Sequence, residues 1–296
     1  MASTDVLDAK PRKPAADGKP ATAPFVADLS VIRTLGTVLP GPLPVAVNGV
    51  RVAASIRPRK LVIQGGDETP VFMPRTAFQI VYSDCTVMID AALDRATHEL
   101  FGGGKEEPYY PEQFAKLERA LNTARLIVLT HYHADHVAGV VCAPNFRDLA
   151  RKTLISAETS DLMVNKPHRP HLRLTEEQIG RFIVLDYRTY YPVAPGVVLI
   201  KSPGHSPDSQ MVYVKLQSGK EILHSVDSAW ILDNILQLKG KAAPWVNEDV
   251  EAIMAQLSWL KHIHDNERDL TLLVTHDDAL FNRVTHEGLI GAELAL

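Results

Sequence analysis

Short apolar runs bounded by turn-forming residues recur along the chain and predict β-strands. Eight runs stand out, at 78–82, 86–89, 126–129, 182–185, 197–200, 211–216, 222–223 and 272–274. Two other stretches repeat apolar residues at helical spacing. They carry Phe114, Leu117 and Leu121 after Pro111, and Val250, Ile253, Met254, Leu257 and Leu260 after a predicted Asn247 cap. Because strands and helices do not alternate strictly, the pattern predicts an α/β fold of mixed sheets covered by helices.

The two ends of the predicted domain differ in character. Residues 1–24 contain no apolar run and are predicted to form a disordered tail, so a single domain is expected over 25–296. Residues 25–50 are rich in Gly and Pro and predict an extended arm, through which a homodimer is one expectation. The stretch 157–181 is interpreted as a helical insertion, with a lid over a pocket and a plain surface excursion both open.

Composition excludes several classes of function. The formal charge of -4 gives no broad basic surface, and the local patch at 57–60 does not change the expectation that nucleic acid is not a partner. No stretch approaches the roughly 20 apolar residues of a membrane helix, and no secretory signal is apparent. The expected location is therefore cytoplasmic. Cys85 and Cys142 are too few for a disulfide framework or a thiolate zinc cluster.

Three histidines and an aspartate lie within six residues, directly after the apolar run 126–129. The segment reads His131, Tyr132, His133, Ala134, Asp135, His136 and is followed by small residues. Imidazole nitrogen and carboxylate oxygen are the ligands that zinc and similar divalent ions take. In a loop between a strand and a helix, the first two histidines can point to one ion while the last two ligands point to a second. A polar surface loop is the alternative interpretation.

This segment resembles the His-x-His-x-Asp-His signature of the metallo-β-lactamase superfamily, and further parts of the family pattern follow in order over 78–280. Asp90 ends a strand where the family has a structural aspartate. His205 lies in a Pro-Gly-His segment, and Asp227 and His276 each follow an apolar run. The resemblance implies a metallo-β-lactamase-like αβ/βα sandwich of two mixed sheets flanked by helices.

The resemblance also implies a two-metal site. One ion would be bound by His131, His133 and His205, the other by Asp135, His136 and His276, with Asp227 between them. The expected cofactors are two divalent ions, Zn²⁺ by preference, with Fe, Mn or Co as alternatives. Such ions share a water and lower its pKa, which leaves a bridging hydroxide for attack on a carbonyl or phosphorus centre. Asp135 and Asp227 are therefore expected to be catalytic as well as metal-binding.

The bridging carboxylate bears on the substrate, because β-lactamases of the superfamily generally have Cys or Ser at the position of Asp227. The spacing of the ligands and the run 206–210 are most similar to the acyl-homoserine lactonases. Trp230 and Thr275 depart from that group, which usually has Tyr and Gly there. Trp230 is expected to line the pocket or donate to a substrate carbonyl, and Tyr132 is a further candidate pocket residue.

The expected function is a dinuclear metal-dependent hydrolase that attacks a small-molecule lactone or ester of the N-acyl-homoserine lactone type. A phosphotriesterase-type hydrolase and a glyoxalase II-like thioester hydrolase remain open. Two hypotheses of another class also remain open, namely an iron-dependent sulfur dioxygenase and a non-catalytic metal-binding protein. Seven histidines lie outside the motifs and are interpreted as structural or surface residues, with His168, His171 and His224 as the possible exceptions by position.

Overall fold

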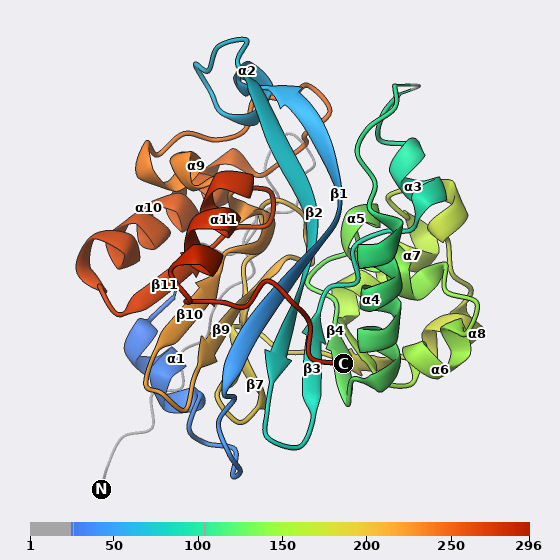
Figure 1. Ribbon diagram of the computed structural model, residues 1–296, viewed down its shortest axis with the longest axis vertical. Helices are drawn as coiled ribbons and strands as arrows, with labels where there is room; N and C mark the ends of the chain where they lie inside the picture. Colours follow the sequence, from blue (N-terminus) through green and yellow to red (C-terminus); the bar gives the residue numbers. More distant parts are fainter. Residues whose placement is uncertain (1–24, 26, 104) are drawn as a thin grey trace, which may run out of the picture.

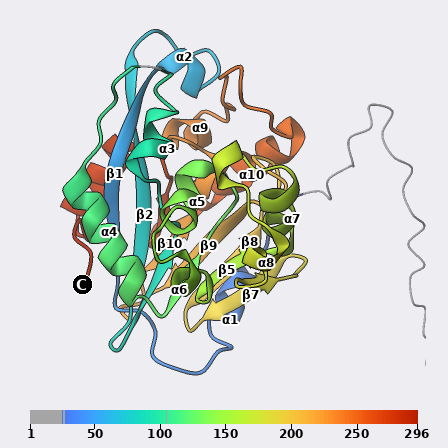
Figure 2. The ribbon, with the colours of Figure 1, turned by 90° about the vertical axis from the view of Figure 1, so that its right-hand side faces the viewer.

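The computed structural model describes residues 25, 27–103 and 105–296. Within this part of the chain, two mixed sheets are flanked by helices on their outer faces (Figures 1 and 2). This confirms the α/β fold class predicted from the sequence. In the described residues, no helix combines the length and the apolar character that crossing a bilayer requires.

The first sheet has six strands, and its strand order follows the chain. The strands are β1 (Ala46–Pro58), β2 (Pro70–Val81), β3 (Thr86–Ile89), β4 (Leu126–Val128), β5 (Thr153–Ser156) and β6 (Ile183–Leu185). β1 and β2 form a long antiparallel hairpin whose turn carries the short helix α2 (Arg59–Val62), whereas β3 to β6 run parallel.

The second sheet has the order β11-β10-β9-β8-β7. Its strands are β7 (Tyr190–Ala194), β8 (Val197–Lys201), β9 (Gln210–Lys215), β10 (Glu221–His224) and β11 (Leu270–Leu273). Neighbours are antiparallel except β10 and β11, so β8, β10 and β11 point the same way.

Helices cover the two outer faces separately (Figure 1). On the side of the first sheet lie α3 (Arg95–Glu99), α4 (Pro111–Thr123), α5 (Ala134–Val141), α6 (Phe146–Ala150), α7 (Ala157–Asn165), the 3₁₀ turn η1 (Pro170–Leu172) and α8 (Glu176–Ile179). On the side of the second sheet lie α1 (Leu29–Leu35), the 3₁₀ turn η2 (Val226–Ser228), α9 (Leu232–Leu236), α10 (Val250–Asn266) and α11 (Asp278–His286).

Alternation along the strands of the first sheet separates two cores. In β3, Val87 and Ile89 belong to the core shared with the second sheet, whereas Met88 belongs to the core under α4 and α5. β4 repeats the pattern, because Val128 lies in the shared core and Ile127 under the helices. β3 and β4 are therefore buried on both faces, and the polar residues that follow them lie in the loops at their ends.

The free edge of β1 is covered by two segments that are distant in sequence. On this edge Gly49 N donates to Gly291 O and Gly291 N donates to Val47 O, both at 2.9 Å. Further along, Ala54 N donates to Pro108 O at 2.9 Å and Tyr110 N donates to the carbonyl of Val52 at 2.8 Å. The edge strand therefore has partners on both sides over much of its length.

All eight predicted runs lie wholly or mostly in strands, but β1, β5, β7 and residues 70–77 of β2 were not predicted. β1 is rich in small and polar residues, and β7 contains Pro192, so neither has the strong apolar pattern of the others. The helix over 250–266 was predicted correctly, but its cap is wrong: the side chain of Asp249, not Asn247, accepts from Ala252 N at 3.0 Å.

The predicted extended arm at 25–50 is wrong in part. Asp28 caps the helix α1, because its side chain accepts hydrogen bonds from Ser30 N and Val31 N. Leu29 and Ile32 of that helix pack into the shared core. Residues 46–50 already belong to β1. Among the described residues of the predicted arm, 25, 27–28 and the Pro-containing segment 36–45 lie outside helices and strands. The predicted tail, 1–24, lies outside the described residues.

Gly139 allows α5 to pack closely on the loop that follows β3. A Cβ at this position would lie 2.0 Å from Ala91 O, which is backbone and cannot move away cheaply. Gly139→Ala should therefore lower the free energy of unfolding by about 1–3 kcal/mol, although Ala favours a helix. Urea unfolding measures this change. The matched control is Gly180→Ala, where no atom lies closer than 3.5 Å and we expect no loss. Equal stability of both variants would contradict the close packing.

Candidate metal centre

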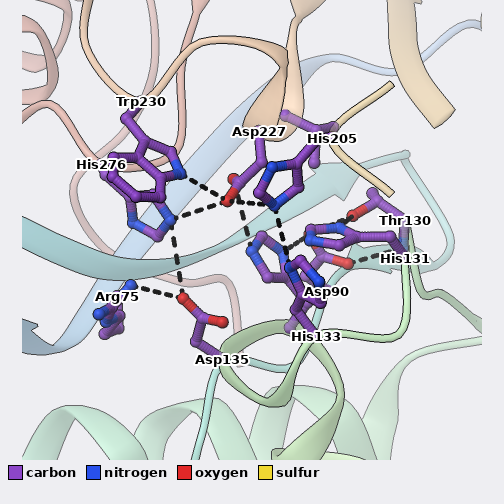
Figure 3. Close-up of polar contacts among 12 residues, drawn as sticks. Arg75, Asp90, Thr130, His131, His133, Asp135, His205, Asp227, Trp230 and His276 are labelled. Atoms are coloured by element: carbon purple, nitrogen blue, oxygen red, sulfur yellow. Dashed lines mark hydrogen bonds and ion pairs between the residues drawn. The ribbon is translucent and has the colours of Figure 1, made fainter. Parts of the chain in front are cut away.

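The side chains predicted to bind metal converge at one edge of the sandwich (Figure 3). The motif loop and α5 follow β4, and His205 follows β8. Asp227 follows β10, and His276 follows β11. Because β4 is parallel to β3 and β5, and β8, β10 and β11 share one direction, the carboxyl ends of these strands present their loops together. The fold brings together residues that are up to 145 positions apart, from His131 to His276.

Short distances link these side chains around Asp227. His276 Nε2 lies 3.2 Å from Asp227 Oδ2, and His205 Nε2 lies 3.4 Å from the same oxygen. His136 Nε2 lies 3.5 Å from the other oxygen, Oδ1. His133 Nδ1 and His205 Nε2 are 2.9 Å apart. The carboxylate of Asp227 therefore stands between the histidines of both predicted ligand sets.

Three groups of side chains have ligand atoms within 4.8 Å of one another. They are His131, His133 and His205; His131, His136 and Asp227; and Asp135, His136 and His276. The first and third groups are the two sets predicted from the sequence. The second group contains Asp227 with one histidine from each set, as a bridging position requires.

The donor atoms fit divalent ions. His131 Nε2, His136 Nε2 and Asp227 Oδ1 are buried and make no hydrogen bond within the described residues. A buried polar atom without a partner costs about 1–3 kcal/mol, and cations between these groups would satisfy all three. Imidazole and carboxylate are suitable ligands for zinc and for other divalent transition metals.

Electrostatics divide the histidines into two kinds. Burial, and then the neighbouring imidazoles, lower the pKa of His131 and of His133 well below its usual value, so both rings are neutral and able to donate a lone pair. Burial acts in the same direction on His136, but Asp90 and Asp227 outweigh it and raise the pKa of His136 well above normal. Burial opposes ionisation of Asp227, yet His276 and His136 hold its pKa well below its usual range.

Asp90 holds the motif loop in place. Its carboxylate accepts hydrogen bonds from Thr130 N and Thr130 Oγ1, both at 2.8 Å. Its Oδ2 lies 2.7 Å from His136 Nδ1, which directs the opposite ring nitrogen of His136 towards Asp227. Asp90 has a φ of +61°, a backbone conformation that Asp tolerates better than most residues. The position thus has the geometry expected of the structural aspartate.

Asp208 was missed by the sequence analysis, although it lies in the noted run 206–210. Its buried carboxylate accepts from Tyr132 N at 2.7 Å, Thr159 Oγ1 at 2.8 Å and Ser206 Oγ at 2.6 Å. These three donors belong to the motif loop, to α7 and to the loop of His205. Asp208 therefore ties together the three segments on this side of the site.

A second missed group lies behind His205. Glu248 Oε1 is 2.6 Å from His205 Nδ1, and the buried Lys241 contacts the same carboxylate as well as the carbonyl of Asp227. A carboxylate behind an imidazole orients the ring and makes it a better ligand. No motif surrounds Glu248 in the sequence, so nothing in the pattern could have indicated it.

Arg75 is the third missed residue. It extends from β2, and its Nη1 donates to Asp135 Oδ2 at 2.5 Å while Nη2 donates to Ser55 Oγ at 3.0 Å. Burial opposes ionisation, but Arg75, and then His136 and His276, hold the pKa of Asp135 well below its usual range. An arginine among the mostly apolar residues of 70–81 is a sequence signal for a buried ion pair, although it does not identify the partner.

A cavity of about 950 Å³ opens onto these residues. Trp230 and Tyr132, the two candidate pocket residues, are among the residues that line it. Trp230 Nε1 donates to Asp227 Oδ2 at 3.1 Å, so in this arrangement the indole is directed at the centre of the site. The segment 157–181 is helical at α7 and α8 and contributes Leu162, Lys166, His168 and Arg169 to the cavity wall. Whether it moves as a lid stays a prediction.

The three possible exceptions among the remaining histidines have different roles. His168 Nδ1 accepts from Ala134 N at 2.9 Å, and its ring lies 4.3 Å from that of His133. His171 Nε2 lies 3.0 Å from Thr97 Oγ1, and the ring of His224 packs edge-on against Phe78 at 4.7 Å. Of the three, only His168 lines the cavity.

The fold and the site together define an α/β sandwich with a cluster of His and Asp ligands at one edge. The profile of the metallo-beta-lactamase superfamily matches residues 71–218, which is half of the chain. The chain belongs to this superfamily, as its motifs predicted.

Similar proteins include lactonases. An N-acyl homoserine lactonase of Bacillus thuringiensis is 23% identical over 157 residues, which cover 51% of this chain and 55% of that protein. Another, of Bacillus cereus, is 22% identical over 149 residues, covering 49% and 52%. The chain thus spans about half the length of the curated relatives it matches.

Solved structures show the same fold. One is an N-acyl homoserine lactone hydrolase with the product N-hexanoyl-L-homoserine bound at its catalytic metal centre, with a TM-score of 0.62, 16% identity and coverage of 81% of this chain and 96% of that one. Another is AidC, a dizinc quorum-quenching lactonase, with a TM-score of 0.57, 14% identity and coverage of 79% and 87%. At these identities the likeness establishes the fold.

Buried histidines should make the metal-free protein sensitive to acid. Five have a lowered pKa in the folded state: His98, His131, His133, His168 and His224. Below the usual pKa of about 6.5, the unfolded chain binds protons that the folded chain excludes, so stability falls with pH. His136 has a raised pKa and acts in the opposite direction. The five histidines with a lowered pKa together outweigh the opposite effect of His136 on stability.

We therefore expect the free energy of unfolding in EDTA to fall between about pH 7.5 and 5.5, with each such histidine contributing at most about 1.4 kcal/mol per pH unit. Urea unfolding at both pH values measures the slope. His224→Gln should make the slope shallower, because burial lowers the pKa of His224 to about 4 and the ring is not a predicted ligand. A flat profile in the unsubstituted protein would contradict the buried, neutral histidines.

Proposed function

We propose that the protein is a metal-dependent hydrolase of ester bonds with a centre of two divalent ions, preferably zinc. In this proposal His131, His133 and His205 bind one ion, Asp135, His136 and His276 bind the other, and Asp227 bridges them. The observation that carries the proposal is the set of buried donor atoms without a partner, on His131, His136 and Asp227, around one point. Membership of the superfamily supports it.

Two ions bound there would lower the pKa of a shared water and so supply the nucleophile, which leaves no need for a nucleophilic side chain. The residues of the chain provide the geometry. Asp90 and Glu248 orient His136 and His205, and Asp227 keeps the two ligand sets together. Trp230, which donates to Asp227, fixes the direction of that carboxylate.

We further propose a lactone of the N-acyl-homoserine type as the substrate. The lactonases among the relatives and solved structures support this choice. The cavity supports it too, because its volume of about 950 Å³ is in the range of small-molecule sites. One of its walls is apolar, built by Leu61, Met73, Trp230 and Val246, and is suited to an acyl chain.

Hydrolysis of a small panel tests the proposal. Zinc-loaded protein is assayed with homoserine lactones, simple aryl esters, a glutathione thioester, a phosphotriester and a β-lactam, with and without chelator. We expect turnover of the lactones above the other compounds and its loss in chelator. Preference for another ester would replace the substrate and keep the metal centre. Inactivity on the whole panel, or one iron and no zinc in the purified protein, would refute the hydrolase.

Replacement of the bridging carboxylate should remove metal and activity together. Asp227→Ala is expected to lose at least one ion by metal analysis and to lower kcat/KM by more than the roughly 10- to 100-fold typical of a residue behind a ligand. The matched control is Asp84→Ala, on the exposed turn between β2 and β3, which should behave like the unsubstituted protein. Full activity of metal-loaded Asp227→Ala would rule out the bridging role.

Trp230→Phe should separate positioning from metal binding. The change removes the N–H that reaches Asp227 and keeps an aromatic wall, so we expect both ions to remain and kcat to fall by roughly fivefold, the value of one hydrogen bond of about 1 kcal/mol. Preference among acyl chains should also change. Trp259→Phe, on α10 against Phe25 and outside the cavity, is the control. Loss of metal in Trp230→Phe would show that the indole does more than orient the carboxylate.

A further inference from the structure

Arg75 places a positive charge directly on one proposed metal ligand (Figure 3). Its Nη1 donates to Asp135 Oδ2 at 2.5 Å, and the two side chains are only 8% and 7% exposed. No other carboxylate contacts Arg75 within the described residues, since its second hydrogen bond goes to the hydroxyl of Ser55. The guanidinium therefore depends on the ligand itself for its counter-charge.

Each of the two ligand sets has one histidine whose second ring nitrogen contacts a carboxylate outside the set. In one set, Glu248 lies behind His205 at 2.6 Å; in the other, Asp90 lies behind His136 at 2.7 Å. Lys241 lies near the first set, 3.5 Å from His205 Nδ1 and in contact with the backbone carbonyl of Asp227. The carboxylate with which it pairs belongs to Glu248, which is not a proposed ligand. Of the arginines and lysines in the described residues, Arg75 is the one that forms an ion pair with a carboxylate predicted to bind metal.

A cation bonded to a ligand carboxylate opposes metal binding in two ways. It occupies a lone pair of Asp135 and draws negative charge away from the oxygen atoms that would face the ion. It also repels a divalent cation across a buried space, where water screens the charges weakly. Asp135 belongs to the set of His136 and His276, whereas Asp227 stands between the two sets. The contact with Arg75 therefore weakens metal binding at the Asp135, His136 and His276 site.

We infer that Arg75 makes the two metal sites unequal: the His131, His133 and His205 site fills first, and the Asp135, His136 and His276 site binds its ion more weakly. The inference rests on the proposed two-ion centre. It adds an order of loading and names Arg75 as the positioning residue that sets this order through its contact with Asp135.

The test is a zinc titration of the metal-free chain against a competing chromophoric chelator, without substrate. We expect two steps of different affinity in the unsubstituted protein. His276→Ala should keep only the tight step, and His205→Ala only the weak one. Arg75→Met should tighten the second step and leave the first unchanged. We expect a gain of about 10- to 100-fold, equal in size but opposite in sign to the loss of affinity that follows removal of a supporting residue behind a ligand.

Two further variants separate charge from packing. Arg75→Lys keeps a cation and should keep the weak second step. Arg57→Met removes a different arginine of the same cavity, one that pairs with Glu107 and touches no proposed ligand, and should leave both steps unchanged. Should Arg75→Met fail to fold without metal, as circular dichroism would show, Arg75→Gln removes the charge while retaining a donor for Asp135 and takes its place in the titration.

The outcomes separate this inference from the proposed function. Equal affinities in the unsubstituted protein, or an unchanged or weakened second step in the neutral variants at position 75, would overturn the ordering alone. A protein that binds no ion at either site would overturn the metal centre and the ordering with it.

Discussion

The need to satisfy buried polar groups is the constraint on which the rest of this structure depends. Imidazoles and carboxylates are packed at the edge of the sandwich, where each polar atom requires a hydrogen bond, an ion pair or a cation. Asp90, Asp208 and Glu248 supply such partners from three different loops. The loops are therefore held by their polar contacts rather than by packing alone. Within the ligand cluster, the atoms without a hydrogen bond, on His131, His136 and Asp227, face one another.

The sheets make this arrangement possible because they deliver many loops to one place. Strands buried on both faces fix the positions of their ends, and parallel strands place those ends side by side. Gly139 then allows α5 to approach the backbone after β3, which brings Asp90 within reach of His136. The contact between Asp90 and His136 thus depends on the close packing at Gly139, which is not itself part of the site.

Much of this could be predicted from the sequence, and the failures have a common physical cause. Strong apolar runs mark the strands of both cores, whereas β1, with Asn48, Gly49 and Arg51, relies on its neighbours for pairing and has a weak pattern of its own. The ligands could be found because they lie in motifs at strand ends. Glu248 could not, since it reaches His205 across 43 positions of sequence through a tertiary contact alone. Arg75 was marked only by its place among apolar residues, and its partner Asp135, 60 positions away, could not be read from that pattern.

The covered edge of β1 has a consequence for behaviour in solution. An exposed edge strand offers unpaired backbone groups to which another chain can add a strand, which leads to aggregation. Here the pairing of β1 with Gly291 and with the segment around Pro108 and Tyr110 occupies those groups. The long hairpin can thus extend from the sheet to the cavity without leaving these backbone groups unpaired. Loss of either covering segment would expose the backbone of β1 to pairing with a strand of another molecule.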